Sequence, residues 1–589
     1  MAALLRLWPV LALCLIAAAA AQAADACGPD CSSIYFPELF RACILNVSSS
    51  TLFPDTDYEA WNDARRVFNA RTLRSPAAVF YANSTEDVAA AVKCAHAWGV
   101  GVTPAAGRQG FQGGAVQDGF LVIDVTGMTQ TSLSPDNKTF TVGAGNSNAM
   151  TMHALHEAAG PGVGITTGVC SFVGTAGFNL GGGFGFLGRC LGLGCDNVVG
   201  LEMVLADGSI VQVDKDREPD LLWASCGGGG GTLGIVTKFT YRLTPLPNGG
   251  RFHSAGCLIR GVPLTAPQID YARGVDNTVS RFMAFQKALP SLDNRFGLFY
   301  GIGQAKFTLF GLFLGEPSEA LQLLRAAGLL EGLDPDRKVG PGESETAGEQ
   351  PIGLVLKGWP SYLDWATLMN TPVWIMNAPW GAPSNFTLTP ENIVYVKAAQ
   401  SGEIRIIGGP DYNAWFFSQS RLSGILPEEA VKEIVQYGAD VGAACLESKG
   451  ADVGCLMAIG GHVLGGAYHD RPADATAFPH HDAYLAVDGT IAVPPAIREL
   501  IPPEANQLLA RPSQLLNGLL SIMKKYDLNA AYANYQPDAL SNYEEAYWAG
   551  NAPRLAAIKT KYDPLGLFSK PGTMQCLVAA GGPNLCNVL

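Results

Sequence analysis

The sequence predicts an α+β fold of two domains. The chain has 589 residues, 48% of them hydrophobic and 15% charged, which is enough apolar chain for more than one core and argues against extensive disorder. Residues 76–243 alternate strand-like runs with helical periodicity, whereas residues 251–520 are rich in aromatic residues and in the alternating segments typical of an antiparallel sheet. PLPNGG (245–250) separates the two patterns, and its turn-forming residues mark the domain boundary.

The first half shows the clearest elements. Apolar runs bounded by turn residues predict strands over 77–82, 101–104, 120–125 and 140–145. Helical spacing predicts a helix over 87–99, capped by Ser84, and another over 148–160. The Asp207-Gly208 turn predicts a hairpin within 198–213, and residues 221–243 begin as a helix and end as a strand.

The second half is less regular. Residues 296–315 alternate in the manner of sheet strands, and residues 428–446 have the spacing of a helix. The charged, glycine-rich stretch 335–352 predicts a surface loop. From residue 511 we expect a helix, then a short strand over 531–535 and a final helix.

The N-terminus predicts a secreted protein. Residues 1–23 combine Arg6, an apolar run too short to span a membrane and a small-residue cleavage signal at Ala21-Gln22-Ala23. A buried N-terminal helix is the weaker alternative. Glycan acceptor triplets begin at Asn46, Asn83, Asn137 and Asn385.

Charge and cysteine content restrict the partners and the redox chemistry. The formal net charge of -13 excludes nucleic acid and anionic membrane surfaces as good partners. Of the 14 cysteines, Cys14 leaves with the signal peptide, so an odd number remains. In an oxidising compartment an odd count indicates one thiol that is free or has another task.

Glycine clusters between residues 160 and 234 point to a phosphate-bearing ligand. Residues 183–188 and 229–234 both match G-x-G-x-x-G in form. Neither follows a strand and opens a helix, so a Rossmann NAD site is the weaker interpretation. Backbone N–H groups in such runs can still approach a pyrophosphate closely.

The residues GVCSFVGTAGFNLGGGFGFLGRCLGLGCDN (168–197) resemble the flavin segment of the berberine bridge enzyme-like oxidoreductases, within the vanillyl-alcohol oxidase and p-cresol methylhydroxylase family. Residues 220–243 and 531–571 resemble two further segments of that family, and 39–44 and 92–100 resemble the places of its disulfide. The resemblance covers most of 35–246 and 525–572 but is thin over the substrate half.

This resemblance implies an FAD-binding PCMH-type fold with a substrate domain on an antiparallel sheet. The implied parts are a signal peptide (1–23), an N-terminal segment (24–70), the FAD-binding domain (71–247), the substrate domain (248–524), a C-terminal segment that completes the FAD domain (525–575) and a tail (576–589). It also implies a Cys43–Cys94 disulfide.

The family resemblance assigns Cys170 a covalent bond to C6 of the flavin, which would leave an even number of other cysteines; a free core cysteine is the alternative. We do not expect the second bond that relatives form from a histidine, because Gln109 occupies the matching position and no histidine occurs between His96 and His153. The loop Gly107, Arg108, Gln109, Gly110 and Phe111 is expected to cradle the pyrophosphate. Further implied FAD contacts are Val173, Gly174, Gly177, Gly181, Gly182, Ile235, Asn534 and Tyr535.

For catalysis, the resemblance points to Tyr532 as the base, with a core tyrosine as the alternative. A tyrosine base needs a partner that favours phenolate. The preceding strand offers Val487 where relatives have Gln or Glu, with Asp488 beside it. Val173 lies where relatives control oxygen access, and its size favours an oxidase.

The sequence leaves the roles of two groups of residues undecided. His462, His469, His480 and His481 fit no standard zinc spacing, so we expect structural or pocket-lining roles and no metal. A stacking wall, or simply core, is expected from Phe299, Tyr300, Tyr412, Trp415 and Phe416.

We therefore expect a secreted FAD-dependent oxidase that takes a hydride from an alcohol or carbohydrate CH–OH group and passes it to O2. Alternatives are a dehydrogenase, an oxidative cyclisation enzyme on an alkaloid-like substrate and a non-catalytic flavin-carrying protein.

Overall fold

The computed structural model describes residues 38–170, 172–250, 252–257, 271–305, 307–329, 354–359, 415–447, 457–493, 506–536 and 540–568. The expected signal peptide, the loop at 335–352, the tail at 576–589, Asn385 and Tyr412 lie outside these residues. The side chains of Trp415 and Phe416 are also outside the description.

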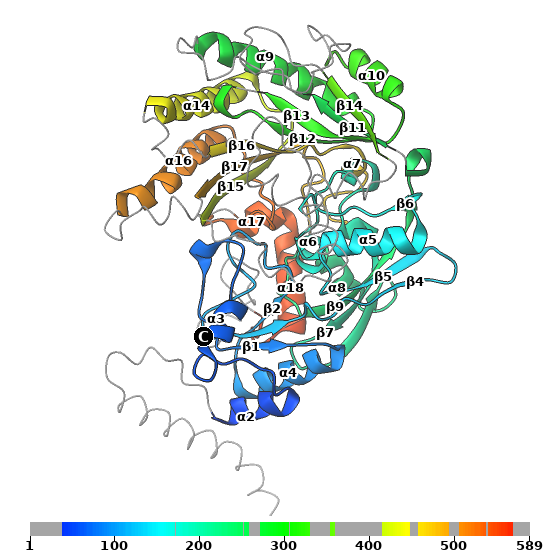
Figure 1. Cartoon of the computed structure of the whole chain (residues 1–589), viewed down its shortest axis with the longest axis vertical. Helices are drawn as coiled ribbons and strands as arrows, with labels where there is room; N and C mark the ends of the chain where they lie inside the picture. Colours follow the sequence, from blue (N-terminus) through cyan, green and yellow to red (C-terminus); the bar gives the residue numbers. More distant parts are fainter. Residues whose placement is uncertain are drawn as a thin grey trace, which may run out of the picture.

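Two sheets form the first half of the molecule (Figure 1). A parallel three-stranded sheet has the order β1 (Ala78–Tyr81), β3 (Leu121–Asp124) and β2 (Val102–Ala105). An antiparallel five-stranded sheet has the order β4 (Thr131–Leu133), β5 (Thr139–Gly143), β9 (Ile235–Arg242), β7 (Val198–Val204) and β8 (Ile210–Asp214). A minor pair joins β6 (Val163–Gly164) to β10 (Thr244–Pro245).

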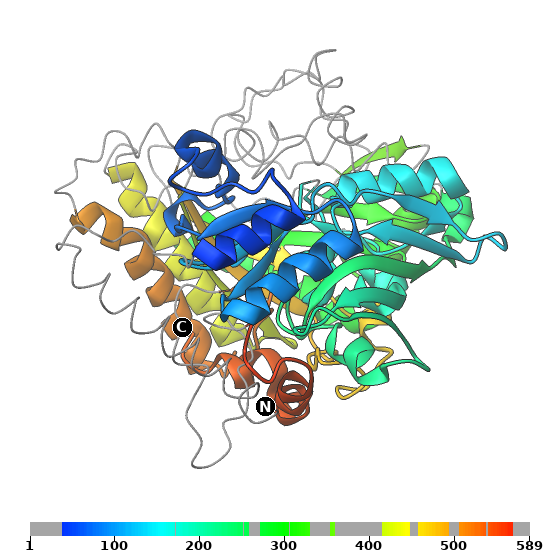
Figure 2. The ribbon, with the colours of Figure 1, turned by 90° about the horizontal axis from the view of Figure 1, so that it is seen from below.

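Helices pack around these sheets. They are α2 (Glu38–Val47), α3 (Tyr58–Ala64), α4 (Thr85–Trp98), α5 (Asn148–Ala159), α6 (Thr175–Leu180), α7 (Gly188–Leu191) and α8 (Pro219–Ala224). Ser84 begins α4 with a capping box, because its side chain accepts a hydrogen bond from the backbone N–H of Asp87 while the Asp87 carboxylate bonds back. A Cys43–Cys94 disulfide with Cα atoms 5.9 Å apart joins α2 to α4. Both helices lie on the face of this half that is turned away from the second half (Figure 2).

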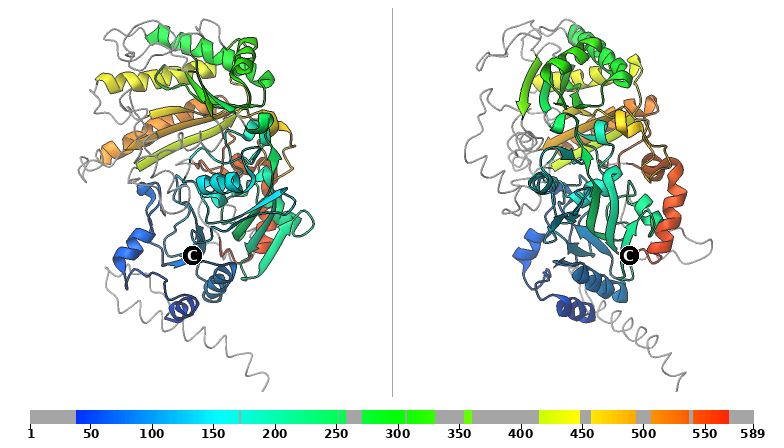
Figure 3. Two further views of the ribbon diagram at one scale, coloured as in Figure 1. Left: turned by 45° about the vertical axis from the view of Figure 1, so that its right-hand side comes forward. Right: turned by 90° about the vertical axis from the view of Figure 1, so that its right-hand side faces the viewer.

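The second half is built on one antiparallel seven-stranded sheet. Its strands in spatial order are β14 (Leu354–Trp359), β11 (Phe252–Cys257), β13 (Thr308–Phe313), β12 (Phe296–Gly301), β16 (Met457–His462), β17 (Leu485–Val493) and β15 (Trp415–Ser423). The helices of this half are α9 (Tyr271–Ala288), α10 (Pro317–Ala326), α14 (Glu428–Glu447) and α16 (Asn506–Lys525). They cover the outer face of the sheet, and its inner face looks toward the first half (Figure 3).

The chain then returns to the first half. Helices α17 (Tyr543–Trp548) and α18 (Ala552–Tyr562) follow α16 and pack into the core of the sheets described first. Trp548 Nε1 donates to the carbonyl of Gly227 at 2.9 Å, which fixes the returning segment beside the glycine run. Sequence-distant segments therefore build one core.

Most expected elements are confirmed, including the strands at 77–82, 120–125 and 140–145, the hairpin around Asp207-Gly208 and the helix at 428–446. The strand expected at 531–535 is wrong, because these residues form a turn in which the N–H of Tyr535 donates to the carbonyl of Tyr532 at 3.0 Å. No helix among the described residues is long and apolar enough to cross a membrane.

Candidate active site

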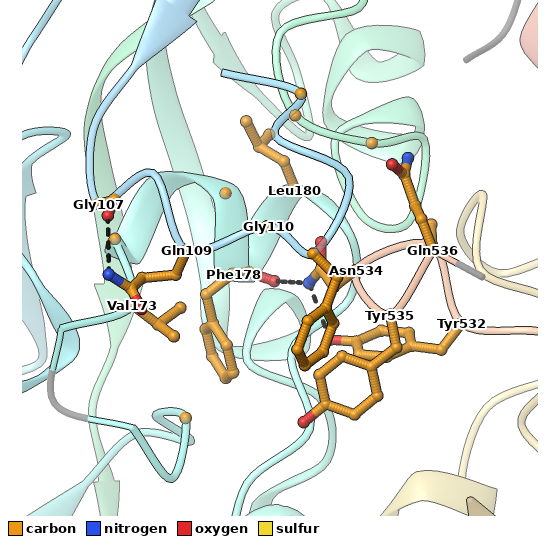
Figure 4. Close-up of a pocket in the computed structure, with 18 of the residues that line it drawn as sticks. Gly107, Gln109, Gly110, Val173, Phe178, Leu180, Tyr532, Asn534, Tyr535 and Gln536 are labelled. Atoms are coloured by element: carbon orange, nitrogen blue, oxygen red, sulfur yellow. Dashed lines mark hydrogen bonds between the residues drawn. The ribbon is translucent and has the colours of Figure 1, made fainter. Parts of the chain in front are cut away.

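A cavity of about 520 Å³ lies between the two halves. This volume falls in the range of cofactor and substrate pockets. Its walls come from the 104–115 loop, residues 168–184, the glycine run at 228–234, strands β15 to β17 and the turn at 532–536. Figure 4 shows how the loop, the glycine-rich segment and the turn converge on it.

The structure brings most predicted site residues together. Those that line the cavity are Gly107, Arg108, Gln109, Gly110, Phe111, Cys170, Val173, Gly174, Gly177, Asp488, Tyr532, Asn534 and Tyr535. Gly181, Gly182 and Ile235 do not line it. Gly181 packs against the side chain of Asn534, and Ile235 points into the core while its neighbours Gly234 and Val236 face the cavity.

The glycines leave the room that a dinucleotide requires. A Cβ at Gly110 or Gly177 would meet no atom within 4 Å, so backbone alone borders open space there. A Cβ at Gly230 would meet only the Cα of Gly177, at 3.6 Å. Backbone N–H groups exposed in this way can bind a pyrophosphate, and the residues present therefore fit FAD.

Two of the lining glycines also hold the cavity wall together. Gly107 and Gly174 pack backbone against backbone, and a Cβ at Gly174 would lie 2.5 Å from the nitrogen of Gly107. This contact joins the 107–111 loop directly to the segment that carries Cys170. A side chain at either position would separate the two segments.

Arg108 contributes its backbone to the cavity but not its guanidinium. Its φ of 55° is unusual for a residue with a side chain. The guanidinium is fully buried behind the loop, where it pairs with Asp124 at 2.5 Å and donates to the carbonyl of Ala64. Only the main chain of Arg108 is therefore placed to take part in the predicted pyrophosphate cradle.

Cys170 faces the cavity without a disulfide partner. Burial raises the pKa of its thiol, while hydrogen bonds from the N–H groups of Phe172 and Val173 oppose that shift. Cys190 in α7 also lacks a disulfide among the described residues, so the odd cysteine count does not by itself single out Cys170.

A second disulfide that the sequence did not suggest joins Cys195 to Cys226. It connects the end of the first glycine-rich segment to the residue before the glycine run at 227–231. With Asp196, this pair is the one cluster of metal-ligand side chains in the described part of the chain, and its sulfurs are already bonded to each other.

Asp488 is half-buried and lines the cavity. On β17 it points inward with Thr490, whereas Val487 lies in the core on the opposite face, so Asp488 and not Val487 occupies the inner position. The hydroxyl of Ser420 on β15 donates to Asp488 Oδ1 at 2.5 Å. Burial raises the pKa of Asp488 to about 7 against the lowering effect of that hydrogen bond.

Tyr532 has its hydroxyl already engaged. The oxygen accepts hydrogen bonds from the N–H groups of Gly183 at 2.9 Å and Phe184 at 3.2 Å and from Asn534 Nδ2 at 2.9 Å. Its ring stacks on Phe184 with centroids 3.9 Å apart. Burial raises the pKa of Tyr532 to about 12, and the three hydrogen bonds, which favour phenolate, oppose that shift.

Tyr535 lies three residues after Tyr532 in the same turn, and its hydroxyl points away from Asn534 (Figure 4). That hydroxyl lies 3.3 Å from Nε2 of His462 on β16. Burial raises the pKa of Tyr535, and the nearby charges of Asp488 and Cys170 add to the shift. Tyr535 is therefore near both the candidate base and the candidate flavin cysteine.

Of the four histidines, only His462 lines the cavity. Burial lowers its pKa to about 4, so it is neutral at physiological pH. The other three satisfy backbone carbonyls: His469 that of Ala483, His480 that of Ala546 and His481 that of Tyr468. Sequence spacing could not separate these roles.

Of the five residues expected in an aromatic wall, the structure describes the side chains of Phe299 and Tyr300. Phe299 on β12 lines the cavity and packs edge-on against His462 with centroids 5.1 Å apart. Tyr300 points the other way into the core, where its hydroxyl donates to the carbonyl of Ala486 at 2.9 Å. Phe68 and Trp548 line the cavity as well and were not anticipated.

Two family descriptions match the segments that build this site. The FAD binding domain matches residues 76–214, which include the 107–111 loop and Cys170. The description "berberine and berberine like" matches residues 531–572, which include Tyr532 and Tyr535. The chain carries the two domains of a berberine bridge enzyme-like FAD-linked oxidoreductase.

Known relatives of this oxidoreductase differ in how much of the chain they match. Glucooligosaccharide oxidase of Sarocladium strictum is 25% identical over 540 residues, 90% of this chain and 92% of that protein. FAD-linked oxidoreductase pytB of Aspergillus terreus is 32% identical over 260 residues, which are 44% of this chain and 30% of that protein. The chain thus spans less than a third of the length of pytB.

A solved structure shares the fold of the oxidoreductase. It is the glucooligosaccharide oxidase from Acremonium strictum with 6-S-cysteinyl, 8α-N1-histidyl FAD, at a TM-score of 0.70 and 23% identity. The match covers 92% of this chain and 100% of that chain. At this identity the likeness establishes the architecture.

Proposed function

We propose that this oxidoreductase is an oxidase of alcohol or carbohydrate CH–OH groups that holds FAD covalently on Cys170 and uses O2 as its acceptor. The observation that carries the proposal is the convergence of Cys170, Asp488 and Tyr535 on one cavity between the two halves. Bound FAD supplies the acceptor for the hydride that leaves the substrate carbon.

In this proposal Asp488 removes the proton of the substrate hydroxyl. A general base works best when its pKa is near the working pH, and a carboxyl with a pKa of about 7 meets that condition. Asp488 thus takes the base role that the sequence gave to Tyr532. We assign contact with the substrate to Tyr535 and not to Tyr532, because the oxygen of Tyr532 already accepts hydrogen bonds from three donors. Tyr535 would orient the substrate oxygen between Asp488 and His462.

The proposed substrate is a neutral sugar or alcohol. The relative with 90% coverage is a glucooligosaccharide oxidase, and the polar residues Ser418, Ser420 and Thr490 of the second-half sheet line the cavity. Anaerobic mixing with a panel of oligosaccharides, primary alcohols and benzylisoquinoline-type amines tests this class. Flavin bleaching by the amines alone would instead favour oxidative chemistry on an alkaloid-like substrate, and no bleaching a non-catalytic carrier.

For the cofactor we propose one covalent bond, through Cys170, and no histidyl bond. The relative with both bonds needs a histidine, whereas here Gln109 lies in the loop and donates to the carbonyl of Gly107 at 3.2 Å. We expect acid-precipitated protein to stay yellow. Cys170→Ala should release the flavin to the supernatant, whereas the matched variant Cys190→Ala should retain it. Flavin in the wild-type supernatant would contradict the bond.

For the acceptor we propose O2, because Val173 lines the cavity close to Cys170. A longer side chain there should block the approach of O2 to the flavin, since close-packed interiors respond to single methylene groups. Val173→Leu is expected to slow air reoxidation of the reduced flavin about tenfold or more. Stopped-flow mixing with aerated buffer measures it, and equally slow wild-type reoxidation would identify a dehydrogenase.

We propose that the protein is secreted. Three of the acceptor asparagines, Asn46, Asn83 and Asn137, are exposed on the surface, as glycosylation requires. Protein purified from the medium of a eukaryotic host should lose mass on treatment with an N-glycosidase.

A further inference from the structure

The 107–116 loop lines the cavity on one side and is covered on the other by residues 64–75. We call these residues the clasp segment. They lie before the matched FAD binding domain, which begins at residue 76. The clasp segment contacts the loop along its whole length, chiefly through the loop's main chain.

At its start, the clasp segment bonds to the residue with the unusual backbone. The N–H of Phe68 donates to the carbonyl of Arg108 at 3.0 Å. The guanidinium of Arg108 returns hydrogen bonds to the carbonyls of Ala64 and Arg66. These reciprocal bonds stabilise the left-handed conformation of Arg108, which otherwise costs free energy.

The middle of the clasp segment holds the aromatic end of the loop. Asn69 is fully buried, and its Nδ2 donates to the carbonyl of Phe111 at 2.6 Å. The ring of Phe68 lines the cavity and meets the ring of Phe111 edge-on at 5.9 Å. Phe111 in turn contacts Tyr535 at 6.0 Å, so this part of the clasp segment reaches the substrate side.

The end of the clasp segment closes the loop. Arg74 Nη1 lies within 3.2 Å of the carbonyls of Gln112, Gly113 and Val116. Gly113 has a φ of 63° and packs against Thr72 so closely that a Cβ would collide with its hydroxyl. One side chain of the clasp segment therefore gathers three carbonyls of the loop.

We propose that the clasp segment is part of the cofactor site and holds the loop in the shape that binds FAD, independently of the bond at Cys170. This inference rests on the proposed function for the identity of the cofactor. The loop contains no histidine that could anchor it to the flavin, so its shape depends on the contacts that surround it.

The test measures FAD affinity in the Cys170→Ala background, where binding is reversible. Asn69→Ala and Phe68→Leu are expected to raise the FAD dissociation constant about tenfold each, as for the loss of one buried hydrogen bond or ring contact. Asp63→Ala is the matched control, because Asp63 lies before the clasp segment and its exposed side chain pairs on the surface with that of Arg66. It should change the constant less than about twofold.

Fluorescence titration of FAD and the melting temperature of the apoprotein give separate readouts. The proposal is supported if both variants raise the dissociation constant of FAD while Asp63→Ala leaves it unchanged. A lowered apoprotein melting temperature with unchanged FAD affinity would show a purely structural role and overturn it. FAD binding by the Cys170→Ala parent tests the cofactor itself, so a parent that binds no FAD would contradict the proposed function. The ratio of the dissociation constant of each variant to that of the parent tests the role of the clasp segment.

Discussion

Asp488 and Ser420 set the expected pH dependence at the scale of single residues. The pKa of Asp488 is raised to about 7, and only the ionised carboxylate can accept a proton. The rate of flavin reduction should therefore rise about tenfold per pH unit below about 7 and level off above it. Asp488→Asn should remove this limb and lower the rate about 10²- to 10⁴-fold. Anaerobic stopped-flow reduction across pH 5–9 is the measurement.

The hydrogen bond from Ser420 lowers the pKa of Asp488, so Ser420→Ala should move the midpoint to higher pH. Ser418→Ala is the control on the same strand face, because its hydroxyl donates to the carbonyl of Gln536 instead. A wild-type rate that is flat from pH 5 to pH 8 would exclude Asp488 as the base.

Single residues also show where sequence reasoning stopped. The sequence placed Cys170, Asp488 and both tyrosines near the flavin, and all of them line the cavity. It gave the base role to Tyr532 and an FAD contact to Tyr535. It could not show which way each hydroxyl points, because that direction depends on a turn and on the N–H groups of Gly183 and Phe184, more than 300 residues away in the chain. His462 was equally hidden among four similar histidines.

At the scale of elements, a buried lysine of α18 connects the helix to the glycine run at 228–234 and forms an ion pair at the end of the helix. Lys559 Nζ pairs with Asp563 at 2.5 Å and donates to the carbonyl of Thr232 at 2.6 Å, and both side chains are fully buried. Lys559→Met should remove the positive charge beside the buried Asp563 carboxylate and destabilise the protein by about 3–5 kcal/mol. Urea unfolding measures this loss.

Lys561→Met is the natural comparison in the same helix. Its side chain is 59% exposed, so a change of less than about 0.5 kcal/mol is expected. Equal effects of the two substitutions would mean that the buried pair contributes nothing special to the attachment of α18.

The elements of the fold differ in how well the sequence predicts them. Helix α4 was recognisable because its cap, its apolar spacing and its terminal Gly99 all agree. The 531–535 segment has strand-like residues, yet it forms a turn in which its tyrosines pack against each other and Tyr532 packs against Phe184. On β17 the alternation alone could not reveal which face is inner, since both faces are covered.

At the scale of the whole molecule, Arg189 joins the two halves. From α7 it donates to the carbonyls of Leu464 and Leu292 in the second half, the latter at 2.7 Å. Burial lowers its pKa to about 10, and it stays charged at physiological pH. Arg189→Met should leave both carbonyls unsatisfied and cost about 2–6 kcal/mol.

Differential scanning calorimetry should then show the single transition broaden or split, as the halves begin to unfold separately. Arg325→Met, an exposed arginine of α10 in the second half, is the comparison and should leave the transition unchanged. A single sharp transition in both variants would locate the coupling of the halves elsewhere.

The packing of Gly107 against Gly174 bears on attempts to engineer this oxidoreductase. A side chain at either position would push apart the two loops that carry Gln109 and Cys170. A mutant library therefore gains nothing by varying Gly107 or Gly174. The productive position is Gln109, whose side chain projects into the cavity from a loop that the glycine contact keeps in register with Cys170. Replacement with histidine there would ask whether a second tether to the flavin can be installed on an unchanged scaffold.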